Sequence, residues 1–347
     1  MSLPKKPPMS LQIDWDKLPA DFALEDHDFE PASEEERQNF MATAPPISYW
    51  KDAWRRLKNN HVAMWSLGIV AVIFLFAFVG PMFFSHSYDT QMRGMENMPM
   101  SLRFPFGTDN LGRDLLLRTM IGARVSLVVG ICASLIVLVI GTIYGSVSGY
   151  AGGSVDNIMM RILDLVYSIP DVLVVLLLTT IIKQPISDWC NSSESALAKG
   201  LVNVGPGLLS IFIAFGLLYW VVLARIIRGQ VLMLKEQEYV TAAKALGAKG
   251  SRVLKRHLWP NCIGQIIVTT FLQIPSAIFL ESFLSFLGVG VSAPMTSLGA
   301  LSSDALSGIY SYPYRLIIPA VILSLLVLCL NLFGDGLRDA LDPRLKK

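Results

Sequence analysis

Long apolar stretches separated by polar segments dominate this chain. Six of them are long enough to cross the hydrocarbon core of a bilayer, which takes about 20 apolar residues in a helix. These stretches cover residues 62–84, 124–149, 157–182, 207–227, 263–290 and 316–333. The pattern predicts an all-α, polytopic membrane protein with about six transmembrane helices. Gly141, Gly145 and Gly149 recur at four-residue spacing in the second stretch, which predicts close approach by another helix.

The rest of the chain divides into a tail, a short helix and one long internal loop. Residues 1–48 are acidic, contain many prolines and few apolar residues, and are expected to be a disordered cytoplasmic tail. Residues 49–61 place Trp50 and Trp54 one helical turn apart beside basic residues, which favours a helix at the membrane interface. A solvated charged stub is the alternative. Residues 62–347 form the transmembrane domain, which includes a polar loop at 228–260.

Composition narrows the class of protein. Of 347 residues, 53% are hydrophobic and 16% charged, against about a quarter charged in a soluble domain. The net charge of +2 does not suggest a nucleic-acid partner. The chain has no Gly-x-x-x-x-Gly-Lys-Ser/Thr phosphate loop, and its cysteines and histidines lack metal-site spacing, so neither ATP hydrolysis nor metal binding is expected.

Lysine and arginine predict the orientation in the membrane. One set of flanks holds residues 51–58, Arg161, residues 225–260 and residues 338–347. It carries about twice as many basic residues as the opposite flanks, and cytoplasmic loops are the basic ones. We therefore expect both termini and the 225–260 segment to be cytoplasmic.

The loop between the fourth and fifth spans has the sequence pattern of two short helices joined at a glycine. Residues 236–246 favour a helix, Gly247 can end it, and a second short helix can follow over 251–257 before Pro260. One face of the first helix carries Tyr239, Ala242, Ala243 and Leu246. Two short helices hinged at a glycine form a knob that fits a groove of another protein. The alternative is an amphipathic loop resting on lipid headgroups.

The same loop resembles a known motif. The run Thr241-Ala242-Ala243-Lys244-Ala245-Leu246-Gly247, with His257-Leu258-Trp259-Pro260 nine residues later, resembles the Glu-Ala-Ala…Gly…Pro loop of ABC-importer permeases. In that family the loop is the coupling helix that docks on the ATPase subunit. The resemblance implies an ATPase-coupling site at Glu238, Tyr239, Thr241, Ala242, Ala243, Leu246, Gly247, His257 and Pro260. Thr241 stands where the family often has an acid.

Further motifs point to one branch of that family. They are Phe106–Asp114 with Gly122-Ala123-Arg124, Met160–Asp164 with Ser168-Ile169-Pro170, Glu281–Gly288, and Gly334–Arg344. Together they resemble signatures of oligopeptide, dipeptide and nickel permeases, and over residues 49–347 they resemble the second membrane subunit, the C subunit. The resemblance implies a type I ABC importer permease fold.

The same resemblance implies a function and partners. The chain would be a non-catalytic subunit in the bacterial cytoplasmic membrane. With a second permease it would form the path for oligopeptide uptake. Two ATPase subunits that bind ATP and Mg²⁺, an extracytoplasmic binding protein and membrane lipid would be its partners, and it would need no cofactor of its own. Import of dipeptides or nickel, or ion-coupled secondary transport, are the alternatives.

Charged residues inside the spans suggest further sites. Arg161 and Asp164 lie one turn apart in the third span and are expected to pair with each other, and Pro170 is expected to kink that helix or to open its hydrogen-bond ladder. Glu281 lies deep in the fifth span, where an isolated charge costs roughly 2.5–3.5 kcal/mol.

Glu281 has polar neighbours on the same helix at Gln273, Ser276 and Ser285. These residues could line the transport pathway, or they could form a hydrogen-bond clamp between helices. In the outer loop, Asp109, Arg113 and Asp114 could form an ion-pair cluster that orders the loop. They could instead contact a binding protein.

Overall fold

The computed structural model describes residues 48–192 and 205–342. The predicted acidic tail, residues 1–48, lies outside the described residues except for its last position. Within the described ranges the chain is helical, with one isolated bridge between Thr108 and Asp114 and no strand. The all-α prediction is confirmed for these residues.

Six helical segments are long and apolar enough to cross a membrane, as predicted. They are α3 (His61–Phe78), α4 (Leu115–Ala151), α6 (Asp171–Ser192), the α8–α9 pair (Pro206–Lys235), the segment Gly250–Phe286 that ends in α12, and α14 (Tyr314–Leu341). Within the paired segments, the elements are α8 (Pro206–Leu218), α9 (Trp220–Lys235), α11 (Gly250–Val253), the π-helical turn η4 (Leu254–Leu258) and α12 (Trp259–Phe286). The other elements are α2 (Tyr49–Asn59), η3 (Gly80–Phe83), α5 (Gly153–Tyr167), α10 (Glu238–Ala245), α13 (Leu298–Ala305) and η5 (Leu306–Gly308).

The third span differs from its prediction. A single kinked helix over 157–182 was expected, but α5 ends at Tyr167 and α6 begins only at Asp171. Pro170 lies in the gap and restricts Ile169 to extended backbone, which stops α5 instead of bending it. Asp171 accepts a hydrogen bond from the backbone N–H of Val172 at 2.8 Å where α6 begins. The prediction of one continuous helix with a proline kink was therefore wrong.

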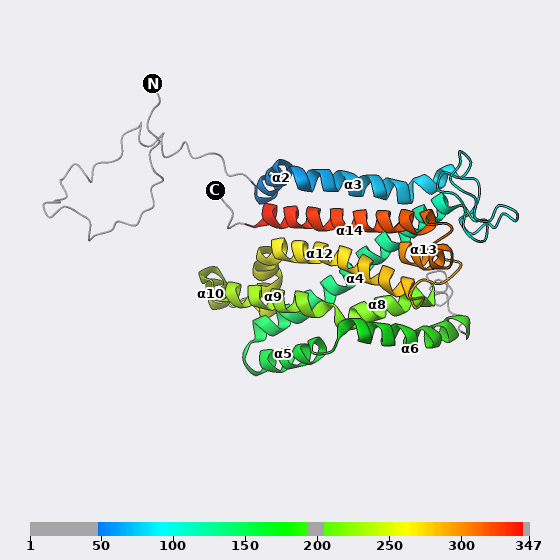
Figure 1. Ribbon diagram of the computed structural model, residues 1–347. Coiled ribbons are helices and arrows are strands. Elements are labelled where there is room, and N and C mark those ends of the chain that lie inside the picture. The colour runs from blue at the N-terminus through cyan, green and yellow to red at the C-terminus, as the bar shows by residue number, and fades with distance from the viewer. Residues whose placement is uncertain (1–47, 193–204, 343–347) are drawn as a thin grey trace, which may run out of the picture. The chain divides into compact units, whose positions relative to one another are not determined.

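The long helix α4 runs diagonally through the bundle and packs against α9 and α12, whereas α3 lies beside α14 (Figure 1). Its glycine face meets α9. A Cβ on Gly149 would lie 2.9 Å from the carbonyl oxygen of Arg228, and a Cβ on Gly145 would overlap the backbone of Ala224. The prediction that this face allows close helix approach is confirmed.

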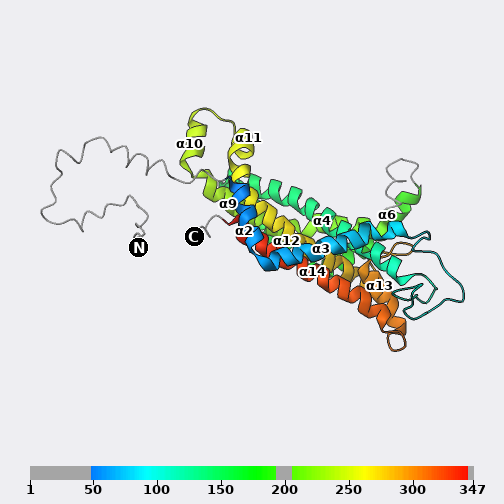
Figure 2. The ribbon, with the colours of Figure 1, turned by 90° about the horizontal axis from the view of Figure 1, so that it is seen from above.

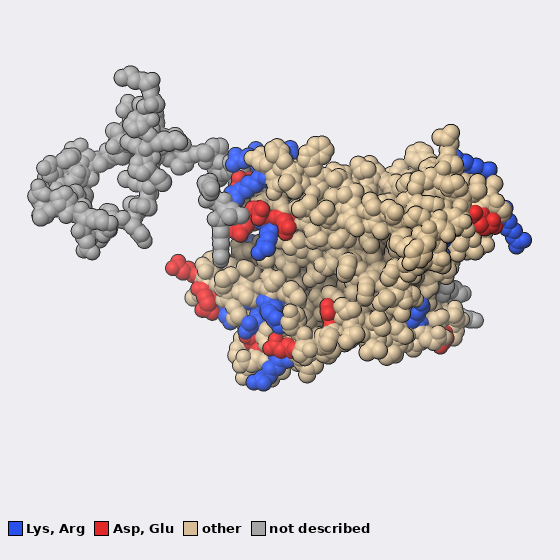
Figure 3. Space-filling model, viewed as in Figure 1, with Lys and Arg blue, Asp and Glu red and all other residues tan. Residues whose placement is uncertain are grey.

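The bundle from Trp50 onward has two polar ends. Helices α2, α10 and α11 and the last turn of α14 lie at one end, and α13 with the 84–114 loop lies at the other (Figure 2). In Figure 3 charged side chains gather at both ends, with few in the band between them. This distribution fits a membrane-embedded middle, because ionised side chains are costly in hydrocarbon.

Candidate functional site

The loop between α9 and α12 forms a protruding knob, defined here as residues 236–258. Helix α10 and the short α11 stand side by side at its tip (Figure 2). Val240, Val253 and Leu258 are fully buried and anchor the knob in the main core. Other side chains point outward: Leu246 is 89% exposed and Tyr239 is 41% exposed. The knob therefore has a fixed base and an open outer surface.

A glycine turn joins the two helices of the knob. Gly247 has φ of +80°, a conformation that L side chains rarely adopt. Its N–H donates to the carbonyl of Lys244 at 2.9 Å, and the N–H of Ala248 donates to the carbonyl of Ala243 at 3.0 Å. These two bonds form a Schellman motif, which satisfies the last carbonyls of α10.

The outer surface of the knob has a shallow groove of about 480 Å³. It is lined by Ala243, Leu246, Ala248, Arg252, Arg256 and His257. The His257 ring lies 6.3 Å from the Tyr239 ring, measured between centroids. Four of the predicted coupling residues thus share one surface, namely Tyr239, Ala243, Leu246 and His257.

The other predicted coupling residues lie around that surface. Glu238 and Ala242 are exposed on α10, and the hydroxyl of Thr241 donates to the carbonyl of Gln237 at 3.5 Å on its own helix. Pro260 was expected to end the second helix of the knob, but it does not. Instead α11 continues through the η4 turn into α12, with Pro260 in the first turn of α12, where the missing N–H of proline is tolerated.

The knob is braced against the end of α4. The ammonium of Lys244 lies 5.7 Å from the Tyr150 ring centroid. Directly after the knob, at the start of α12, the indole N–H of Trp259 donates to the Ser146 hydroxyl at 2.9 Å. A Cβ on Gly250 would lie 2.9 Å from the Tyr150 ring. Displacement of the knob would therefore displace α4.

A salt bridge ties α5 to α9 below the knob. Two guanidinium nitrogens of Arg228 donate to the two carboxylate oxygens of Asp156, each at 2.6 Å. The Ser148 hydroxyl donates to the same carboxylate at 2.5 Å. The hydrogen bond from Arg228, assisted by that from Ser148 and opposed by burial, lowers the pKa of Asp156. Sequence reasoning missed this pair because the two residues are separated by 72 positions.

The predicted pairing of Arg161 with Asp164 is wrong. Asp164 accepts a hydrogen bond from Arg225 of α9 at 3.0 Å, and Arg161 is exposed on α5. The guanidinium of Arg225 also lies over the Tyr167 ring, 4.9 Å from its centroid. Asp164 therefore joins two helices, whereas a local pair would have stayed within one.

Glu281 lies at the junction of α12 and α4. It is fully buried and accepts hydrogen bonds from Ser126 of α4 at 2.8 Å, from Ser282 at 3.2 Å and from Ser285 at 2.7 Å. Ser276, by contrast, is exposed and bonds to its own helix at Leu272, and Gln273 is half-buried. The arrangement around Glu281 is that of an inter-helix clamp.

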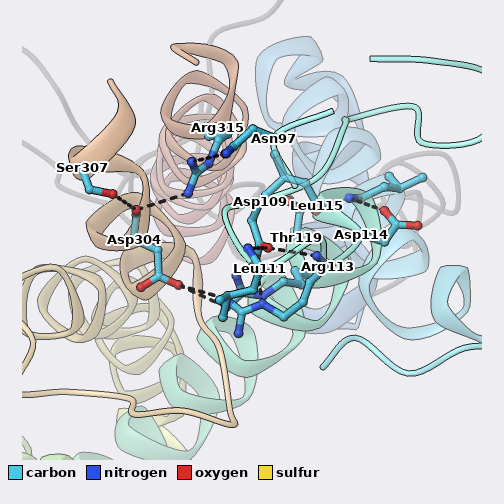
Figure 4. A network of polar contacts seen from close by, with 12 residues as sticks. Asn97, Asp109, Leu111, Arg113, Asp114, Leu115, Thr119, Asp304, Ser307 and Arg315 are labelled. Carbon is cyan, nitrogen blue, oxygen red and sulfur yellow. Dashed lines mark hydrogen bonds and ion pairs between the residues drawn. The ribbon is translucent and has the colours of Figure 1, made fainter. Parts of the chain in front are cut away.

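At the opposite end, a buried polar cluster orders the 84–114 loop (Figure 4). The Asp109 carboxylate accepts hydrogen bonds from Nε of Arg113 at 2.7 Å and from Nη1 of Arg118 at 2.5 Å. Arg118 also binds Asp304 of α13 at 3.2 Å. Burial, which alone would raise the pKa of Asp109, is outweighed by backbone N–H groups and the two arginines, so its pKa is lowered.

Other contacts extend this outer cluster. Asp114 caps α4 by accepting from the N–H of Leu116 at 2.9 Å, and it also contacts His86. Nη1 of Arg315 donates to the Asn97 side chain at 2.9 Å, which links the loop to α14 (Figure 4). Sequence reasoning found Asp109, Arg113 and Asp114 but missed Arg118, Asp304 and Arg315. Arg118 interrupts an apolar run after Leu117, and this interruption was the available signal.

These features define a polytopic helical membrane protein with a knob that protrudes at one end of its bundle. A model of the binding-protein-dependent transport system inner membrane component matches residues 138–347, and the N-terminal TM domain of oligopeptide transport permease C matches residues 48–99. The chain belongs to this family of transport-system inner membrane components.

Three relatives show how far the similarity extends. The Dipeptide transport system permease protein DppC of Bacillus subtilis is 45% identical over 315 residues, 90% of this chain and 92% of the relative. The Oligopeptide transport system permease protein OppC of the same species is 43% identical, covering 92% of this chain and 97% of the relative. The OppC protein of Escherichia coli is 42% identical over 86% of this chain and 92% of the relative.

Proposed function

We propose that this chain is one of two permease subunits of an importer that takes up oligopeptides, driven by separate ATPase subunits. The observation that carries the proposal is the knob, a firmly anchored pair of short helices with an exposed groove at one end of six spans. The family description and the names of the relatives, which are dipeptide and oligopeptide permeases, support the substrate class.

The proposed partners follow from this role. A second permease completes the path, and an extracytoplasmic binding protein delivers the peptide. Two ATPase subunits bind ATP and Mg²⁺, and this chain contributes no catalytic residue and needs no cofactor. The proposed location is the bacterial cytoplasmic membrane, with both termini and the knob in the cytoplasm, which the basic residues around the knob favour.

The proposed mechanism is alternating access. Closure of the ATPases on ATP moves the knob. The contact of Lys244 with Tyr150, and that of the adjoining Trp259 with Ser146, carry the movement into α4. Helix α4 in turn packs on α9 and α12, so the bundle reopens toward the outside and accepts a peptide. The Glu281 clamp keeps α4 and α12 together during this movement.

Dipeptides are the second candidate substrate, favoured by the 45% identity to a dipeptide permease. Uptake experiments separate the two. The chain, its second permease, the ATPases and the binding protein are co-expressed and reconstituted in liposomes, and uptake of labelled peptides of two to five residues is measured with ATP. Uptake of peptides longer than two residues supports the proposal, and uptake of dipeptides alone supports the second candidate. Transport by this chain alone, driven by an ion gradient, would refute both.

A further inference from the structure

Two interruptions in neighbouring helices border an open pocket on one side of the bundle. One is the gap between α5 and α6 at residues 168–170, and the other is the single residue Tyr219 between α8 and α9. The pocket measures about 420 Å³ and is lined by residues that include Tyr167, Ser168, Asp171, Leu218 and Tyr219. Polar groups at the two interruptions are thus brought together.

The pocket lies near the middle of the membrane-spanning region. Helix α8 has 13 residues before Tyr219 and α9 has 16 after it. At about 1.5 Å per residue these lengths are nearly equal, so Tyr219 lies close to the centre of its span. Non-helical backbone at this depth is tolerated only where protein covers it or where it lines a water-filled cavity.

The side of the bundle that carries this pocket is poorly covered. In α6 only 11% of the most apolar 18-residue stretch is buried, which is the lowest share among the six spans described. Asp171 nevertheless exposes its side chain there. A carboxylate facing hydrocarbon is costly, so this side is expected to face water or protein, as a transport path would provide.

The chemistry of the pocket suits a cationic group. Asp171 accepts the Tyr219 hydroxyl at 3.1 Å and the N–H of Val172 at 2.8 Å. A carboxylate has about four acceptor sites, so two remain. No ion pair to Asp171 is found within residues 48–192 and 205–342, and Arg225 nearby on α9 is engaged by Asp164. The walls formed by Leu218 and Val222 are apolar.

We propose that this pocket binds the α-ammonium group of the transported peptide, with Asp171 as its counter-ion and Tyr219 holding the carboxylate in place. The proposal rests on the proposed peptide import. The apolar walls would accept side chains of differing shape beside the ammonium group, which every peptide with a free amino terminus carries.

The test is photo-crosslinking in the assembled importer. A tripeptide with a diazirine side chain at its first residue is supplied with binding protein and ATP, the sample is irradiated, and labelled fragments are identified by mass spectrometry. Labelling within residues 166–171 or 218–222 is expected in the wild type. Asp171→Asn should reduce it about tenfold, since a charge-assisted hydrogen bond contributes on the order of one factor of ten. Asp188→Asn, which makes the same change at an exposed position farther along α6, should leave it unchanged.

Several results would overturn the proposal. One is intact uptake of the same tripeptide by the wild type with no labelling in these segments, and another is equal labelling in Asp171→Asn. A loss of the second permease on purification of Asp171→Asn would assign the carboxylate to a subunit contact instead. Failure of the wild type to take up the tripeptide would refute peptide import itself, a separate result.

Discussion

Arg228 of α9 holds Asp156 of α5 through two parallel 2.6 Å hydrogen bonds from its guanidinium. The carboxylate also receives the Ser148 hydroxyl of α4, and Lys235 donates to the carbonyl of Gly149 at 3.1 Å. Three helices therefore meet at one carboxylate. This junction lies at the end of the bundle that carries the knob, so it fixes the support from which the knob projects.

Asp156→Asn should lower the stability of the purified protein by about 1.5–3 kcal/mol, because a charge-assisted bidentate pair is lost. The measurement is thermal unfolding in detergent. Asp164→Asn is the matched control. In its pair with Arg225 the arginine side chain is 45% exposed and the aspartate side chain 68% exposed, and exposed pairs contribute about 0–1 kcal/mol. Equal effects of the two substitutions would contradict the role given to Asp156.

The same pair predicts a pH dependence. The pKa of Asp156 is lowered in the folded state, so its contribution to stability is present above the unfolded carboxyl pKa of about 3.9 and is lost as the pH falls through the folded value. The difference in melting temperature between the wild type and Asp156→Asn should be largest near neutral pH and shrink below about pH 4. A difference that stays constant across this range would show that the ion pair does not stabilise the fold.

The sequence predicted the number of spans because each is a long apolar run. It did not predict where α5 stops, since the apolar pattern continues from Leu165 to Val172 with only Ser168, Pro170 and Asp171 interrupting it. Asp164 looked like a partner of Arg161 by spacing. Arg225, 61 residues away, reaches it only after α5 and α9 pack, and one sequence carries no signal for such a contact.

The two predicted sites fared differently for a similar reason. The groove on the knob joins residues that lie close in sequence, so the helical pattern could group Ala243 with Leu246, and the motif added His257, which lies in the η4 turn. The outer cluster needs Asp304, which is contributed by α13 at a distance of 186 residues from Arg118. Only local members of that cluster could be found from the sequence.

Asp109→Asn should destabilise the outer end of the bundle by about 3 kcal/mol. It removes the closest counter-ion of Arg118, whose side chain is only 4% exposed, and leaves only the more exposed Asp304 as its carboxylate partner; a buried charge that loses its main partner is costly. Unfolding in detergent is again the measurement, with Asp89→Asn, an exposed aspartate in the same loop, as the control. The pair Asp109→Asn with Arg118→Met should be less destabilising than Asp109→Asn alone. A larger loss in the double variant would contradict this explanation.

Gly247→Pro should abolish coupled transport while the protein still inserts in the membrane. Proline requires φ near −65° and has no N–H, whereas Gly247 has φ of +80° and donates to Lys244. Gly247→Ala meets no atoms within 4 Å, so only the positive φ opposes it, at about 1–2 kcal/mol. A partial loss is therefore expected.

Peptide uptake and peptide-stimulated ATP hydrolysis in the reconstituted importer are the two readouts for this series. Gly229→Ala is the control, since Gly229 is helical and equally free of close neighbours. Full coupling in Gly247→Pro would show that the turn between α10 and α11 is not required.

The most direct measurement is crosslinking from the knob to an ATPase. A photoreactive amino acid is placed at Ala242, which is exposed on α10, and for comparison at Leu102, which is fully exposed in the 84–114 loop at the opposite end. Irradiation of native membranes that take up peptide should join position 242, and not position 102, to a nucleotide-hydrolysing subunit. Transport-competent membranes in which position 242 reaches no such subunit would contradict the account.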